Sequence, residues 1–193
     1  MSALENEAVI RVRKALVDAG MADTVMEMAD TARSAEDAAE SIGCTLGAIA
    51  KSLVFSIEEN EVQHMVMALI AGDHQCVEAA LVAAFNLTGT VRRPRASEVK
   101  EVTGFSIGGV PPIGLMQKLP VVIDRSLKRF DAIYAAAGHP HCVFKTDVTT
   151  LSRLTGGLIS QAIGLPDDPN RTSRVNLKAS RSLAEKRLLR ARE

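Results

Sequence analysis

The chain has 193 residues, of which 47% are apolar and 24% charged, a balance typical of one soluble globular domain with a buried core. A formal net charge of zero provides no overall field to attract nucleic acid, and 3% aromatic residues argue against a single-strand binder built on base stacking. The three cysteines are widely spaced and odd in number, which disfavours a disulfide framework, and no apolar run approaches the roughly 20 residues of a membrane span. We therefore expect a cytoplasmic protein with no membrane partner.

The first half of the chain predicts helices at its start and two paired strands after them. Apolar residues recur at helical spacing from Val9 to Ala19, and Gly20 ends the pattern. Ser34 and Asp37 have the spacing of a capping box, which opens a second helix. The elements expected here are a helix over residues 5–19, a short strand over 23–28, a helix over 34–42, strands over 48–57 and 62–70, a turn at 71–74, a helix over 75–85 and a short strand at 90–91.

The second half predicts short strands between helices, which together indicate a mixed α/β domain with a largely covered sheet. Ser97 and Asp147 are the expected N-caps of two helices, and Gly156 with Gly157 ends the second of them. The elements expected here are a helix over residues 98–102, strands over 119–124, 130–136 and 142–145, a turn at 138–141, and a helix that ends at residue 154.

Lys51 lies in the first long strand, on the face that it shares with Leu53 and Phe55, because side chains alternate along a strand. If the larger apolar side chains point into the core, the ammonium of Lys51 points inward with them. A buried ammonium is costly and seldom kept without a partner or a role. The alternative is that Lys51 lies near the strand start and extends its side chain to water.

Residues 103–114, T-G-F-S-I-G-G-V-P-P-I-G, predict a rigid loop pinned into the core. Four glycines and two prolines oppose a helix and a central strand, while Phe105, Ile107 and Val110 favour burial. Bare N–H groups on such a loop can bind a carbonyl, a carboxylate or a phosphate. The alternative is a tight turn that only joins two elements.

Basic residues gather in two places. Arg92, Arg93 and Arg95 could contact phosphates, and the alternative is a solvated charged loop. Residues 166–193 hold eight Lys or Arg against four Asp or Glu, so this segment has a net charge of +4. We expect a domain over residues 1–165 and a basic C-terminal tail over 166–193, either solvated or clamping nucleic acid.

Several kinds of catalytic or metal site find no support in the sequence. His139, His141 and Cys142 do not have zinc-ligand spacing, and the chain has no CxxC pair. The pattern G-x-S-x-G occurs at residues 104–108, but it follows a predicted helix and lies in a rigid loop, not between a strand and a helix as a nucleophile elbow does, and the chain has no P-loop. A Cys142 nucleophile paired with His141 is disfavoured because neighbours on a strand face opposite sides. We expect neither a metal nor a cofactor.

Three segments in order resemble the YbaK/ProX family of free-standing aminoacyl-tRNA deacylases, which are related to the insertion (editing) domain of bacterial prolyl-tRNA synthetase. They are A-K-S-L-V-F at 50–55, the glycine-proline loop at 103–114, and A-A-G-H-P-H-C-V-F-K-T at 136–146 with L-T-G-G at 154–157. The resemblance covers residues 5–162. It implies a compact α/β domain around a mixed, barrel-like sheet surrounded by helices. It also implies hydrolysis of the ester between a small wrong amino acid and tRNA, most simply a tRNA-Pro-type substrate.

The resemblance also implies roles for individual residues. The catalytic positions would be Lys51, Gly108 and Gly109. The substrate-binding positions would be Val110, Pro111, Pro112, Gly138, His139 and His141. For the two histidines the alternative is a turn histidine with internal hydrogen bonds. The contacts with tRNA would come from Arg92, Arg93 and Arg95. Fixed N–H groups of the glycines would stabilise the negative charge on the ester oxygen, and Lys51 would hold the terminal phosphate, the ribose or the attacking water.

The expected partners are an aminoacyl-tRNA and, second, an aminoacyl-tRNA synthetase, with no DNA and no membrane. The main alternative is a non-catalytic module that binds an aminoacyl or nucleotide group and docks on a synthetase. A second alternative is an esterase acting on small molecules without tRNA.

Overall fold

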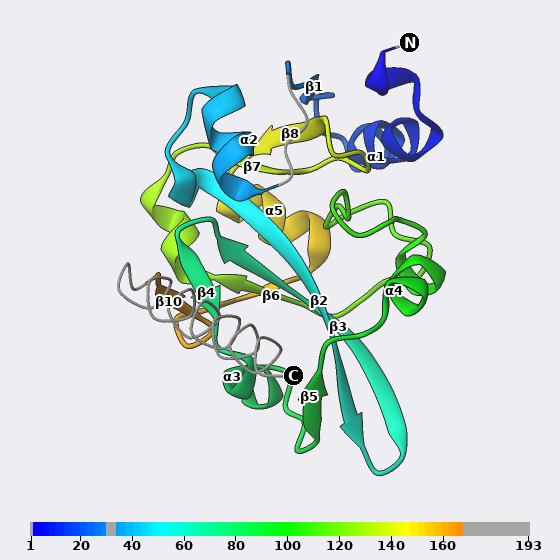
Figure 1. Ribbon diagram of the computed structural model, residues 1–193, viewed down its shortest axis with the longest axis vertical. Helices are drawn as coiled ribbons and strands as arrows, with labels where there is room; N and C mark the ends of the chain where they lie inside the picture. Colours follow the sequence, from blue (N-terminus) through cyan, green and yellow to red (C-terminus); the bar gives the residue numbers. More distant parts are fainter. Residues whose placement is uncertain (1, 30–33, 168–193) are drawn as a thin grey trace, which may run out of the picture.

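A mixed sheet of eight strands forms the centre of the molecule, in the order β1-β8-β7-β2-β3-β6-β9 with β5 paired to β2 beside that path (Figure 1). The computed structural model describes residues 2–29 and 34–167. The strands of this sheet are β1 (Val25–Glu27), β2 (Ile49–Glu59), β3 (Val62–Ala71), β5 (Thr90–Arg92), β6 (Val121–Asp124), β7 (Ile133–Ala136), β8 (Cys142–Thr146) and β9 (Leu158–Ser160). Two further strands, β4 (His74–Cys76) and β10 (Gly164–Pro166), pair with each other. The predicted mixed α/β class is confirmed, and the path of the sheet is open, with β1 and β9 at its ends.

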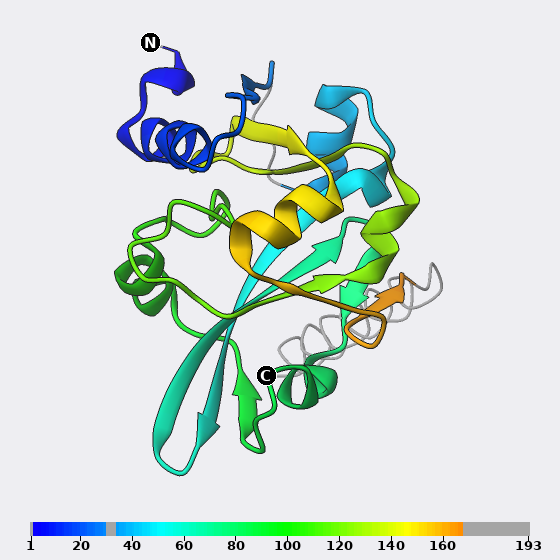
Figure 2. The same cartoon turned by 180° about the vertical axis from the view of Figure 1, so that it is seen from behind.

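Several helices begin where a polar side chain binds their first amides. The helical elements are η1 (Ala3–Glu5), α1 (Glu7–Asp18), α2 (Ala35–Ile42), η2 (Leu46–Ala48), α3 (Glu78–Ala84), α4 (Ala96–Thr103), η3 (Arg125–Arg129) and α5 (Val148–Thr155). The predicted capping box of Ser34 and Asp37 opens α2, and Asp147 caps α5 as predicted, accepting from the N–H of Thr150 at 2.9 Å. In Figure 2, which views the molecule from behind, α5 crosses in front of β2.

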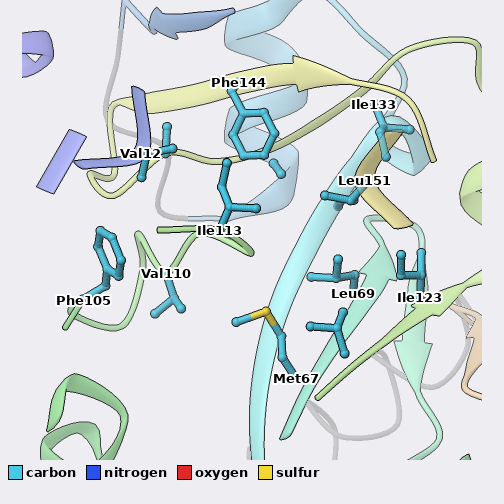
Figure 3. Close-up of a cluster of buried hydrophobic side chains, with 14 of the residues drawn as sticks. Val12, Met67, Leu69, Phe105, Val110, Ile113, Ile123, Ile133, Phe144 and Leu151 are labelled. Atoms are coloured by element: carbon cyan, nitrogen blue, oxygen red, sulfur yellow. The ribbon is translucent and has the colours of Figure 1, made fainter. Parts of the chain in front are cut away.

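Both faces of the sheet are covered, because the side chains of β2 enter two different cores. Ala50 and Val54 belong to a cluster that also contains side chains of α1, α5 and the glycine-proline loop (Figure 3). Phe55 and Ile57 belong to a second cluster with Leu81 of α3. The loop is therefore pinned into the core as predicted, through the buried side chains of Phe105 and Val110, whereas Ile107, which was also expected to be buried, is 61% exposed.

The secondary structure differs from the predictions in four places. Residues 74–76, expected as the end of a turn and the start of a helix, form β4, because they pair with β10 far along the chain. Arg95, not Ser97, is the N-cap of α4, and the Glu98 carboxylate accepts the Arg95 N–H at 2.7 Å. The strand expected over 130–136 begins at Ile133, after the short helix η3. Strands β9 and β10 were not predicted, since neither has a local pattern of alternating residues.

Strand β2 lacks a partner strand along part of one edge, and the candidate functional site lies beside this unpaired part. On one side it pairs with β3 continuously from Glu59↔Val62 to Ala50↔Ala71. On the other side it pairs with β7 only at residues 49–50 and with β5 only at residues 56–58. Among the described residues, no strand therefore pairs with residues 51–55 on that side.

Candidate functional site

A cavity of about 500 Å³ lies along the open edge of β2. Its wall includes Lys51, Ser52 and Val54 of β2. One part is apolar, with Ala38 of α2 and Val143 of β8, and another carries Ile107, Gly108 and Arg93. This volume is in the range of pockets that hold small ligands. The lysine strand and the glycine-proline loop, more than 50 residues apart in sequence, thus border one cavity.

Lys51 is half-buried, and its ammonium is held by main-chain carbonyls. Its Nζ donates to the carbonyl oxygens of Gly72, at 3.0 Å, and His74, at 2.5 Å. Burial lowers the pKa of Lys51, and the nearby carboxylates of Asp167, Glu36, Asp73 and Asp124 act against this shift. Of the two placements considered for Lys51, the inward one is therefore found. Two of its three protons are engaged, which leaves one to donate to a ligand.

The turn that carries these carbonyls is held by a buried carboxylate that the sequence did not single out. Asp124 is 2% exposed, and it accepts from the N–H groups of Ala71, at 3.3 Å, and Ser126, at 2.9 Å. Its Oδ2 also lies 3.0 Å from Nδ1 of the buried His74, without the alignment of a hydrogen bond. Asp124 thereby ties the β3–β4 turn to the end of β6. The only sequence signal was a carboxylate directly after a buried apolar strand.

The two glycines at the centre of the loop have different environments. Gly108 has a φ of +98°, lines the cavity, and has no acceptor for its N–H among the described residues. The N–H of Gly109 is directed at the carbonyl of Ser106, 3.2 Å away, and does not face the cavity. The expectation that both amides serve the substrate is corrected in this respect. Pro111 and Pro112 are buried and lie outside the cavity wall, where they stiffen the loop from the core side.

The turn at 138–141 docks directly on the loop. The Gly138 N–H donates to the carbonyl of Gly109 at 3.0 Å, and a Cβ on Gly109 would lie 3.0 Å from the N of His139. His139 lines the cavity, whereas Gly138 and His141 do not. Nδ1 of His139 accepts the His141 N–H at 3.2 Å, which leaves Nε2 to carry the proton of the neutral ring.

Of the three arginines, only Arg93 borders the cavity. Its guanidinium lies 4.3 Å from the centre of the Phe55 ring and 2.8 Å from Glu78. Arg92 is occupied by Glu58, at 2.6 Å, and by Glu98, at 2.7 Å.

The other basic residues differ in their availability. The side chain of Arg95 is 86% exposed, and its one ion pair with a described residue is a 3.7 Å contact with Glu98, so it is the most available of the trio. The predicted basic tail lies outside the described residues, except for its first two positions. Neither a cluster of three His, Cys, Asp or Glu side chains suited to a metal nor a helix long and apolar enough to cross a membrane occurs within residues 2–29 and 34–167.

Comparisons with known proteins place this geometry among editing domains. Residues 29–154 match the family model of the aminoacyl-tRNA editing domain. The uncharacterized protein YwhH of Bacillus subtilis is 34% identical over 131 residues, which are 68% of this chain and 80% of that protein. The multifunctional Ser/Thr-tRNA deacylase ProXp-y of Escherichia coli is 38% identical over 106 residues, 53% of this chain and 62% of that one. A crystal structure described as a proposed trans-editing enzyme for prolyl tRNA synthetase superposes with a TM-score of 0.73 at 31% identity, covering 84% of this chain and 99% of that one.

Proposed function

The chain belongs to the aminoacyl-tRNA editing domain family, and on that premise we propose that it hydrolyses the ester bond of mischarged aminoacyl-tRNA. The observation that carries the proposal is that Lys51 and Gly108 line the same cavity. The similarity to a Ser/Thr-tRNA deacylase supports the reaction type. The similarity to a proposed prolyl trans-editing enzyme supports a tRNA-Pro-type substrate and a synthetase as partner.

The chemistry follows from the groups that face the cavity. Water adds to the ester carbonyl carbon, negative charge develops on the carbonyl oxygen, and the bond to the ribose oxygen then breaks. The N–H of Gly108 and the remaining proton of Lys51 donate to the developing oxyanion. No side chain stands out as a nucleophile, so the free hydroxyl of the ribose passes the proton of water to the leaving oxygen. Most of the acceleration then comes from orientation of an ester that is already activated.

The same cavity suits a small acyl side chain. Its apolar part is walled by Ala38 and Val143, and selection by one methylene is worth only about 1–3 kcal/mol, so several small amino acids would be accepted. Arg95, which lies outside the cavity, and Arg93, which borders it, contact tRNA phosphates, so binding of tRNA weakens as the salt concentration rises.

A panel of tRNAs mischarged with Ala, Cys, Ser or Thr tests the proposal by release of free amino acid. Lys51→Ala should lower the rate by about 10²–10³-fold, as loss of an oxyanion donor does. Lys118→Ala, which removes an exposed lysine elsewhere, should leave it unchanged. Circular dichroism checks the fold of both variants. Undiminished release in Lys51→Ala would exclude this lysine from the reaction, and binding without release would favour the non-catalytic alternative.

A further inference from the structure

The direction of the main-chain groups along the open edge of β2 follows from its hairpin turn. Asn60 and Glu61 both have positive φ, 50° and 64°, and they link Glu59 directly to Val62. These are the features of a two-residue type I′ turn, in which the flanking residues exchange both hydrogen bonds. Hydrogen-bonded pairs then alternate with open pairs along the strands. Odd-numbered residues of β2 therefore direct their N–H and C=O groups toward β3, and even-numbered residues direct theirs away from it.

Pairing on the other side of β2 agrees with this alternation. Ala50 faces β7, and Ser56 and Glu58 face β5. Between them, Ser52 and Val54 direct two N–H and two C=O groups into the unpaired gap. Among the described residues no strand takes these groups, and both residues line the cavity.

The side chain of Ser52 adds a third kind of polar group to this edge. Its Oγ is inaccessible to solvent and has no hydrogen-bond partner within the described parts of the chain. Buried polar groups are almost always paired, because leaving one unpaired destabilises the fold. A hydroxyl and two carbonyls left together at the wall of one cavity form a set of acceptors for a group that carries several N–H donors.

We propose that the open edge of β2 at Ser52 and Val54 binds the α-ammonium group of the aminoacyl ester. Two of its three N–H donors match the main-chain carbonyls of Ser52 and Val54, the third reaches the Ser52 hydroxyl once that side chain rotates about its Cα–Cβ bond, and the ester carbonyl lies near Gly108 in the same cavity. This inference rests on the proposed function and adds to it that the substrate must carry a free α-amino group. The volume of about 500 Å³ is that of a site for a small group, which favours the aminoacyl group over an added protein strand as the ligand.

Binding of a non-hydrolysable probe tests this without relying on catalysis. The probe is 3′-alanylamido-3′-deoxyadenosine, compared by calorimetry with its N-acetylated form on the full chain. Loss of a charged hydrogen bond predicts that the acetylated probe binds about 10- to 100-fold more weakly. Ser52→Ala should weaken binding of the free-amine probe and reduce the difference in affinity between the two probes. Ser56→Ala is the matched control, since its buried hydroxyl is also unpaired but lies outside the cavity wall.

The outcomes separate this proposal from the one on which it rests. Discrimination between the two probes without hydrolysis of any aminoacyl-tRNA would support the ammonium subsite and reject the deacylase. Hydrolysis of alanyl-tRNA and N-acetylalanyl-tRNA at equal rates, or equal binding of both probes, would overturn the subsite while leaving the deacylase standing. Equal loss of affinity in the Ser52 and Ser56 variants would also overturn the role of Ser52.

Discussion

Substitution of Asp124 by Asn tests whether the turn that holds Lys51 depends on one buried carboxylate. Two different oxygens of Asp124 accept the N–H groups of Ser126 and Ala71. An asparagine has one acceptor oxygen, so its NH₂ group would meet one of these N–H donors and leave it unpaired. The close approach of His74 to the negative charge is lost as well.

The magnitude follows from these contacts. An unsatisfied buried N–H together with the loss of a hydrogen bond to a charged group amounts to about 3 kcal/mol. For a domain of this size that corresponds to a fall of about 6–12 °C in Tm. The carbonyls of Gly72 and His74 would shift with the turn, so hydrolysis should also slow at temperatures where the variant remains folded.

Urea and thermal unfolding followed by circular dichroism measure the change, with Asp131→Asn as the control. Asp131 is exposed, and its substitution removes the same formal charge from the surface. A loss of less than about 1 kcal/mol in Asp124→Asn, which is the scale of an ordinary surface hydrogen bond, would refute the reasoning. Equal losses in the two variants would show that net charge, and not the buried contacts, sets the stability.

Two further predictions concern the loop and the pH dependence. Gly108→Ala meets no neighbouring atom but requires an alanine at a φ of +98°, so it should cost about 1–2 kcal/mol and reduce hydrolysis, whereas an unchanged rate would remove Gly108 from the site. Hydrogen bonds from Arg92 and the Arg95 amide lower the pKa of Glu98 from 4.5 to about 2. A depressed carboxylate pKa stabilises the fold above pH 4.5, and this contribution is lost as pH falls toward 2. Between pH 5 and 2 the Tm should therefore fall more in the parent protein than in Glu98→Gln, and parallel curves would contradict this.

The sequence predicted the parts of this molecule that depend on neighbours in the chain. The capping box at Ser34 and the cap at Asp147 form helix starts through contacts three residues away, and both are found. The direction of Lys51 followed from alternation along one strand. The two segments that meet at the cavity were identified because each has an unusual local composition.

The features that were not predicted depend on the folded arrangement of the chain, which no local sequence pattern indicates. His74 reads as part of a turn, but strand β10, about 90 residues later, pairs with it. Gly108 and Gly109 are equivalent in sequence, and only the conformation of the folded loop, with a φ of +98° at Gly108 and the Gly109 N–H directed at the Ser106 carbonyl, distinguishes their amides. The orphan hydroxyl of Ser52 became visible only with the gap between β7 and β5, which is a property of the sheet and not of the strand.

The two-residue turn at Asn60 and Glu61 sets a constraint on how this family member can change over time. Because the turn fixes which residues of β2 face β3, deleting or inserting one residue between Ser52 and Glu59 would exchange the roles of every residue of β2 that precedes the change. Lys51 and Ser52 would then face opposite sides of the sheet from those they face now, and the ammonium of Lys51 would lose its hydrogen bonds to the carbonyls of Gly72 and His74. Insertions and deletions should therefore be absent from this segment among relatives, even at positions where substitutions are tolerated.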